Sequence, residues 1–140
     1  MNMKKILYTL LLSLIYINVH AQEICEDTCL HVHGIDISHY QGDVFWEAIG
    51  DNSKMAYVYI KCTEGGDNQD PTYYRNILLA KQYGLKVGSY HFYRPKTDQQ
   101  TQLRNFLAQC KPDQQDLLPM IDIESAGGYS SARFCDSLKG

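Results

Sequence analysis

Leu117-Leu-Pro-Met-Ile-Asp-Ile-Glu124 is a short apolar run that ends in two acids. A run of this length that is apolar on both faces is typical of a buried strand in a parallel sheet. Pro119 has no N–H to donate to a neighbouring strand, so it fits only at the start of this one. The acids then lie at the carboxyl end of the strand, where β/α barrels collect their functional side chains.

Three earlier segments share this pattern of a short run rich in Ile, Val and Tyr. They are residues 33–38, 56–61 and 86–92. Their centres lie about 30 residues apart, which is the size of a βαβ module. The sequence therefore predicts four strands with a helix after each.

Capping and terminating residues mark the helices expected after these strands. They are Asp43, then Asp70 with Pro71, then Gly84 as a terminator, then Thr97 with a capping-box spacing, and finally Ser130 or Ser131. Four strands alternating with four helices predict right-handed crossovers and a parallel sheet with helices outside it.

The loop after the first strand indicates whether this sheet is open or closed into a barrel. A doubly wound open sheet would need a glycine-rich phosphate loop there, and residues 35–40 do not form one. We therefore predict an α/β fold of the irregular TIM-like β/α barrel type, with only the first four βα units present. A complete barrel has ~250 residues, so we interpret the chain as a truncated product or fragment. Its two unpaired sheet edges lead us to expect self-association.

Residues 1–21 have the composition of a secretory signal peptide. Two lysines precede an apolar stretch over residues 6–17, and Ala21 ends a small-residue cleavage site. The stretch is shorter than the ~20 residues of a membrane-spanning helix, so we expect no span after cleavage. We expect a secreted or periplasmic protein with an extension over residues 22–33 and a barrel domain over residues 34–140.

The composition suits one globular domain, with 44% hydrophobic and 21% charged residues and a net charge of −3. Affinity for nucleic acid comes largely from Lys and Arg that neutralise phosphates. Because this chain has a net negative charge, we do not expect it to bind nucleic acid.

Five cysteines would enter an oxidising compartment, and because five is odd, at least one is free or pairs between chains. Cys25 and Cys29 fit a disulfide better than a zinc knuckle. A bridge between Cys110 and Cys135, on successive helices, stays open. The His-x-His segment at residues 31–33 is a weak metal signal, because no third ligand has a suitable spacing.

Asp122 and Glu124 point to one face of their strand, because side chains alternate along it. Their Cα atoms lie ~6.6 Å apart at a rise of ~3.3 Å per residue. Two carboxylates on one wall raise each other's proton affinity, so one can act as an acid while the other stays ionised. Glycoside cleavage needs this division of labour. Asp36, between two isoleucines, projects into the same barrel mouth. The alternative for Asp122 and Glu124 is an ordinary solvated strand end. The alternative for Asp36 is a core aspartate that hydrogen-bonds loop amides.

Polar and aromatic residues at the other strand ends are candidate contacts for a sugar. Lys61 and Glu64 can contact the substrate or form a salt bridge with each other. His91 can hydrogen-bond a carboxylate or a sugar hydroxyl, or it is a satisfied buried histidine. Tyr40 and Tyr90 can stack on sugar rings.

Four motifs follow one another in the same order as in a known family. They are Gly34-Ile-Asp-Ile-Ser-His-Tyr-Gln-Gly42, Tyr59-Ile-Lys-Cys-Thr-Glu-Gly65, Gly88-Ser-Tyr-His-Phe92 and Leu118-Pro-Met-Ile-Asp-Ile-Glu124. With these motifs the chain resembles the Chalaropsis-type lysozymes, glycoside hydrolase family 25. Cys62 departs from the family pattern, in which a small residue such as Ala is usual.

The resemblance implies an irregular β/α barrel that hydrolyses the β-1,4 bond between N-acetylmuramic acid and N-acetylglucosamine in peptidoglycan. Its partner would be the glycan strand, and neither a metal ion nor an organic cofactor is implied. By resemblance Glu124 is the general acid, and Asp122 positions the substrate's N-acetyl group or modulates Glu124. Asp36 completes the acidic cluster. The residues implied to line the cleft are Lys61, Glu64, Tyr90 and His91.

Two other hypotheses compete with a peptidoglycan hydrolase. The first is an inactive fragment or a carbohydrate-binding remnant of such an enzyme, which the four-unit length favours. The second is an exported redox or metal protein built on the cysteines. The second is disfavoured, because the sequence has no CxxC and its cysteine spacings are irregular.

Overall fold

A curled, mostly parallel sheet organises residues 31–138, the part of the chain that the computed structural model describes. Its parallel strands, in spatial order, are β1 (His33–Ile37), β2 (Met55–Glu64), β4 (Lys86–Phe92) and β5 (Met120–Asp122). A short strand, β3 (Asn68–Gln69), pairs antiparallel with the end of β2. The fold is therefore α/β with a curled parallel sheet, and closure into a barrel stays a prediction.

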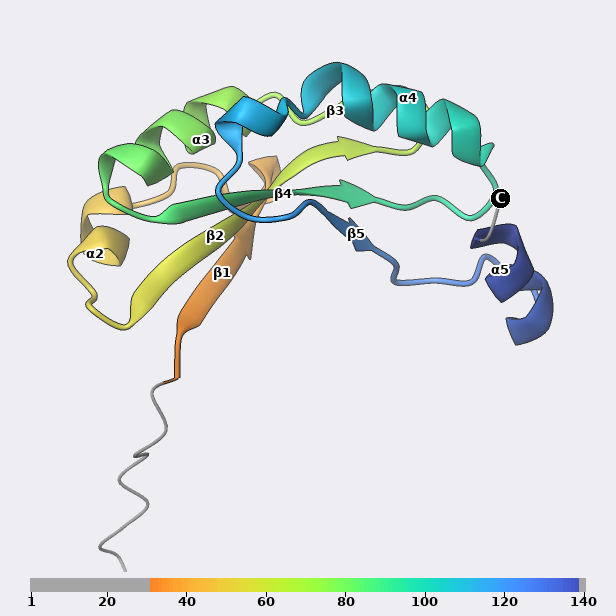
Figure 1. Ribbon diagram of the computed structural model, residues 1–140, viewed down its shortest axis with the longest axis horizontal. Helices are drawn as coiled ribbons and strands as arrows, with labels where there is room; N and C mark the ends of the chain where they lie inside the picture. Colours follow the sequence, from red (N-terminus) through yellow and green to blue (C-terminus); the bar gives the residue numbers. More distant parts are fainter. Residues whose placement is uncertain (1–30, 139–140) are drawn as a thin grey trace, which may run out of the picture. The chain divides into compact units, whose positions relative to one another are not determined.

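Among residues 31–138, helices cover one face of this sheet and leave the other face open (Figure 1). The α-helices are α2 (Trp46–Gly50), α3 (Tyr73–Gln82), α4 (Gln99–Gln109) and α5 (Ser131–Leu138). Two 3₁₀ turns, η1 (His39–Gln41) and η2 (Pro112–Gln114), follow β1 and α4. The predicted order of four strands, each followed by a helix, is confirmed. The last strand is shorter than predicted and begins just after Pro119.

The helix ends follow the sequence signals at some positions and depart from them at others. Gly84 comes just after α3 and adopts a φ of 80°, which favours glycine, as predicted. The Ser130 hydroxyl accepts the Arg133 N–H at 3.4 Å, which confirms one of the two proposed starts of the last helix. The proposed cap at Thr97 is wrong, because the carboxylate of Asp98 accepts the Thr101 N–H at 2.8 Å.

Two predicted caps are wrong because their carboxylates have long-range partners. Asp43 lies before α2 and binds Arg75 of α3 at 3.0 Å, while α2 itself has no side-chain cap. Asp70 accepts hydrogen bonds from His39 after β1 and from Thr72, and α3 begins only at Tyr73. Both acids tie sequence-distant segments together instead of capping a helix.

Alternate strand residues form the core between the sheet and the helices. Ile37, Val58, Ile60 and Val87 are at most 4% exposed and pack with residues of α3 such as Ala80. Burial of such aliphatic side chains stabilises the fold by about 1.5–3 kcal/mol each.

The cysteines of the described residues are free thiols. The bridge considered between Cys110 and Cys135 is therefore not formed. Burial raises the pKa of Cys62 to about 12, so its thiol stays protonated and unreactive in the folded chain. Cys25, Cys29 and the predicted signal peptide lie outside the described residues. Within residues 31–138, no helix has the length and apolar character to span a membrane.

Two glycines let tyrosine rings lie flat on the open face of the sheet. Gly34 pairs with Tyr57 across β1 and β2, and Gly88 pairs with Tyr59 across β4 and β2. A Cβ atom on either glycine would overlap the ring of its partner. The Tyr59 hydroxyl then reaches across the sheet and donates to the carbonyl of Leu118 at 3.0 Å.

Gly88→Ala is expected to lower the free energy of unfolding by about 1–3 kcal/mol, because the added methyl group forces the Tyr59 ring off the sheet. Urea unfolding of Gly88→Ala, Tyr59→Ala and the double variant measures the coupling. We expect Gly88→Ala to cost little in the Tyr59→Ala background. Equal costs in both backgrounds would contradict this account of the glycine.

We also predict that the chain self-associates through this open face and the edges formed by β1 and β5. Sedimentation velocity over a range of concentrations measures it. Met120→Lys places a charge on the edge strand β5, where Met120 is 40% exposed, and should weaken the association. Leu78→Lys on α3 is the matched control at a 71% exposed position away from the sheet edges. A monomer at every concentration would contradict the prediction.

Candidate active site

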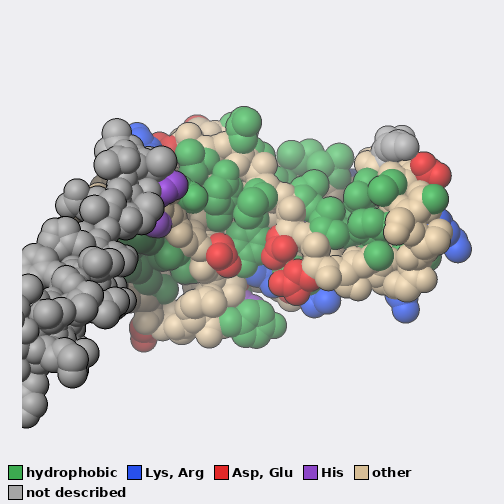
Figure 2. Space-filling model, turned by 90° about the horizontal axis from the view of Figure 1, so that it is seen from below, with side chains coloured by type: hydrophobic (Ala, Val, Ile, Leu, Met, Phe, Trp, Pro, Cys, Tyr) green, Lys and Arg blue, Asp and Glu red, His purple; other side chains and the backbone are tan. Residues whose placement is uncertain are grey.

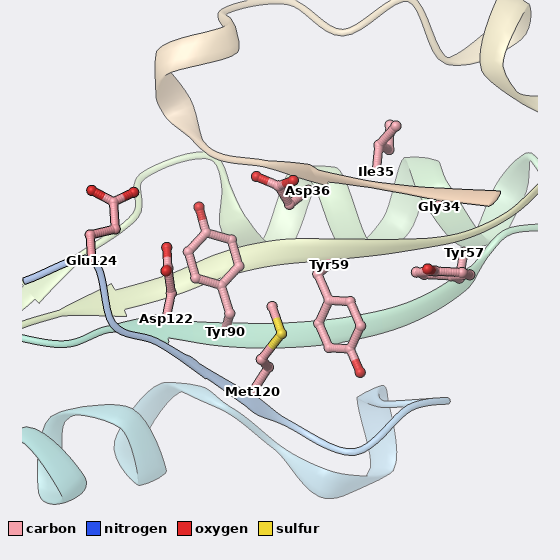
Figure 3. A pocket seen from close by; sticks show the side chains of 9 residues that line it. All are labelled: Gly34, Ile35, Asp36, Tyr57, Tyr59, Tyr90, Met120, Asp122 and Glu124. Carbon is pink, nitrogen blue, oxygen red and sulfur yellow. The ribbon is translucent and has the colours of Figure 1, made fainter. Parts of the chain in front are cut away.

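A cavity of about 460 Å³ lies on the open face of the sheet and collects the three predicted acids (Figure 3). Asp36 comes from β1, Asp122 ends β5 and Glu124 follows it. The remaining lining residues are Gly34, Ile35, Tyr57, Tyr59, Tyr90 and Met120. Figure 2 shows acidic side chains gathered near the middle of this face, with apolar side chains on both sides. The predicted convergence of the acids on one cavity is thus observed.

Strand alternation explains why the acids share this cavity. Met120, Asp122 and Glu124 are two residues apart and all line it, whereas Ile121 lines a separate cavity on the helix side. Asp36 lies across the sheet on the opposite edge strand. The curl of the sheet therefore brings carboxylates from its two outer strands over a common floor of tyrosines.

Tyr90 is the buried polar group between these acids. Figure 3 shows its hydroxyl in the same space as Asp36 and Asp122. Burial raises the pKa of Tyr90 to about 12, and the negative charges of Asp36 and Asp122 act in the same direction. The phenol therefore keeps its proton at neutral pH and is available as a hydrogen-bond donor in the cavity.

The family sequence profile described as glycosyl hydrolases family 25 matches residues 35–139. This chain belongs to that family. Lysozyme M1 of Streptomyces globisporus is 34% identical over 97 residues, which cover 66% of this chain and 33% of the lysozyme. The N,O-diacetylmuramidase of Arthroderma benhamiae is 35% identical over 100 residues, 69% of this chain and 42% of that enzyme.

A solved muramidase has a similar fold over part of its length. The muramidase from Trichobolus zukalii superposes with a TM-score of 0.68 at 32% identity, covering 77% of this chain and 56% of the muramidase. The family-25 chain described here spans less than half the length of the curated relatives it matches.

Lys61 and Glu64, which the family resemblance implied as cleft residues, form an ion pair beside the cavity and do not line it. Arg94 binds the other oxygen of Glu64. Burial alone would raise the pKa of Glu64, but hydrogen bonds from Lys61 and Arg94 hold it below its usual value. The salt-bridge alternative for Lys61 and Glu64 is therefore the one that the family-25 structure shows.

Tyr40 projects from the turn after β1 and is 76% exposed. Its ring contacts that of His39, with centroids 4.0 Å apart, and lies 5.5 Å from the ammonium nitrogen of Lys61. Tyr40 is thus outside the acidic cavity and offers an exposed aromatic face. Its proposed role as a sugar platform stays a prediction.

His91 does not line the cavity that collects the three acids. Its ring faces the helix layer, 2.8 Å from the hydroxyl of Thr63 and 3.1 Å from the side-chain oxygen of Gln102. Tyr90 and His91 are adjacent in β4, so only one of them can face the acids. His91 is the satisfied buried histidine that the sequence left as the alternative.

His91 should make the chain less stable in mild acid. Burial lowers the pKa of His91, and the nearby charge of Lys61 acts in the same direction. Stability is therefore lost as the pH falls below about 6.5, the pKa of histidine in the unfolded chain. Below that pH the unfolded chain binds a proton at His91 more readily than the folded chain does. Urea unfolding at pH 7.5 and 5.5 tests this. His91→Gln should flatten the difference, and an unchanged difference would contradict it.

The sequence did not predict that Tyr57 and Tyr59 line the cavity, nor the position of Arg94. Tyr57 and Tyr59 alternate with buried residues of β2, and each pairs with a glycine on a neighbouring strand, Tyr57 on β1 and Tyr59 on β4. That pairing could be found only by aligning the strands in register. No three His, Cys, Asp or Glu side chains within residues 31–138 form a metal site.

Proposed function

We propose that this chain forms the acidic wall of the cleft of a family-25 lysozyme, which hydrolyses the β-1,4 bond between N-acetylmuramic acid and N-acetylglucosamine in peptidoglycan. The observation that carries the proposal is the gathering of Asp36, Asp122 and Glu124, from the two outer strands, around one cavity. The similarity to a lysozyme and to muramidases supports the same chemistry.

In this proposal Glu124 is the general acid that protonates the leaving oxygen. Like Asp36 it is exposed, and it lies just beyond the end of β5, where a glycan strand can reach it. Asp122 is half-buried and would orient the N-acetyl group of the substrate. Asp36 faces them from β1, and the protonated phenol of Tyr90 would donate a hydrogen bond to a carboxylate or to the sugar.

The proposal includes export, with residues 1–21 as a signal peptide and a secreted or periplasmic location. Peptidoglycan lies outside the cytoplasmic membrane, so an enzyme acting on it has to be exported. We propose that residues 22–33 form a short extension and that residues 34–140 are the N-terminal part of a family-25 barrel.

Digestion of purified peptidoglycan followed by borohydride reduction tests the proposal. Cleavage on the muramic side yields reduced muramic acid, whereas cleavage of the other bond yields reduced glucosamine. New muramic reducing ends are expected. New glucosamine ends, or no new ends at all, would contradict the proposed activity.

A wall-binding role without catalysis is the second candidate, favoured because the described residues leave the cavity on the sheet open to solvent. Co-sedimentation with purified cell walls distinguishes the two. Binding without any new reducing ends would support the second candidate.

A further inference from the structure

Arg94 is an exposed arginine whose side chain is held in place from two directions. Its guanidinium donates from Nε to an oxygen of Glu64 at 2.8 Å and lies 4.6 Å from the centre of the Phe92 ring. Its side chain is still 54% exposed. An arginine fixed this way loses little conformational entropy when it binds a further partner.

The backbone of Arg94 is fixed as well. Its N–H donates to the side-chain oxygen of Gln102 at 2.9 Å, and its carbonyl accepts from the side-chain nitrogen of Gln102 at 3.0 Å. Gln102 is 2% exposed and belongs to α4. The chain thus holds both the backbone and the side chain of Arg94, although the end of that side chain reaches solvent.

This arginine follows the end of β4, the strand that pairs with the strand of Asp122. Phe92, on which its guanidinium rests, pairs with Asp122 across β4 and β5. The next residue, Tyr93, donates its N–H to the carbonyl of Asp122 at 2.9 Å. The guanidinium is therefore at the end of the strand that neighbours the proposed catalytic strand.

The local charge leaves Arg94 able to take another anion. The carboxylate of Glu64 forms ion pairs with two cations, through one oxygen with Lys61 and through the other with Arg94. Lys61 is buried against Phe92 and is not accessible. Among the described residues, the Nη1 nitrogen of Arg94 has no hydrogen-bond partner. Within this group two cations share one carboxylate, so the guanidinium of Arg94 keeps donor capacity for a further anion.

We propose that Arg94 is a specificity residue that binds a carboxylate of the glycan substrate, either on the lactyl group of muramic acid or on its stem peptide. This inference rests on the proposed function. A β-1,4 polymer of N-acetylglucosamine alone has no such carboxylate, so Arg94 would favour the acidic glycan over a neutral one. A charge-assisted hydrogen bond at an exposed edge corresponds to about a tenfold preference.

Binding of the full chain to soluble glycan fragments tests the proposal by isothermal titration. The probes are peptide-free fragments with a free lactyl carboxylate, peptide-bearing fragments, and each of them after amidation of its carboxylates. We expect the unmodified chain to bind one acidic probe about tenfold more tightly than its amidated form. The probe that shows the preference identifies the lactyl or the peptide carboxylate as the ligand.

Arg94→Gln should reduce this preference to about one while leaving affinity for the amidated probe unchanged. Arg94→Lys, which keeps the charge but lacks the planar fork, should give an intermediate preference. Arg75→Gln is the matched control, because Arg75 is also an exposed, ion-paired arginine but binds Asp43 away from the cavity. Thermal unfolding of each variant checks that the fold is retained.

The outcomes separate the two proposals. An unchanged preference in Arg94→Gln, or an equal loss for acidic and amidated probes, would overturn the role of Arg94. A wild-type chain that binds with the expected preference but releases no reducing ends would support Arg94 while contradicting hydrolysis. A chain that binds neither form would contradict both.

Discussion

Glu124→Gln is expected to lower the rate of peptidoglycan hydrolysis by about 10²–10⁴-fold. The amide has nearly the shape of the acid but cannot give a proton to the leaving oxygen. Because Glu124 lies beyond the end of β5 and is exposed, the substitution should leave the stability of the fold unchanged. Loss of turbidity of purified walls and release of reducing ends both measure the rate.

The matched control is Glu47→Gln in α2, an exposed glutamate away from the cavity. It should hydrolyse walls at the wild-type rate. Affinity for the wall should be the same in both variants, since the proposed role of Glu124 is in proton transfer. Full activity in Glu124→Gln would show that another group supplies the proton and would remove Glu124 from the proposed mechanism.

The strands and the acidic cavity could be predicted because both depend on local pattern. Short apolar runs mark buried parallel strands, and alternation puts residues 122 and 124 on one face. The same rule could not tell which of Tyr90 and His91 faces the acids. β4 is buried on both faces, so exposure does not distinguish its two sides. Its polar residues Ser89 and His91 face the helices, where Tyr73 and Gln102 bind them.

The roles of several polar residues could not be predicted because their partners are distant in sequence. Asp43 has the right type and position for a helix cap, but Arg75, 32 residues away, binds its carboxylate. Arg94 is one of several surface arginines in the sequence. Only the structure shows that its guanidinium binds Glu64, which lies 30 residues earlier in the sequence.

Asp70→Ala is expected to lower the free energy of unfolding by about 3 kcal/mol at neutral pH, because it leaves several donors without an acceptor. The side chain of Asp70 is fully buried. One oxygen accepts the His39 N–H at 2.9 Å and lies 2.8 Å from the His39 ring nitrogen. The other accepts the Thr72 N–H at 2.9 Å and its hydroxyl at 2.7 Å. Asp113→Ala, at an exposed position in η2, is the control and should cost less than about 0.5 kcal/mol.

The contribution of Asp70 should also disappear in acid. Burial alone would raise the pKa of Asp70, but the hydrogen bonds from His39 and Thr72 hold it below its ordinary value. Its stabilising effect is therefore complete above the unfolded pKa of about 3.9 and is lost as the pH falls through the lower folded value. The free energies of unfolding of wild type and Asp70→Asn, measured in urea, should differ most at pH 7, and the difference should shrink as the pH falls below about 3.9. A difference that stays constant over this range would mean that Asp70 acts through its shape and not through its charge.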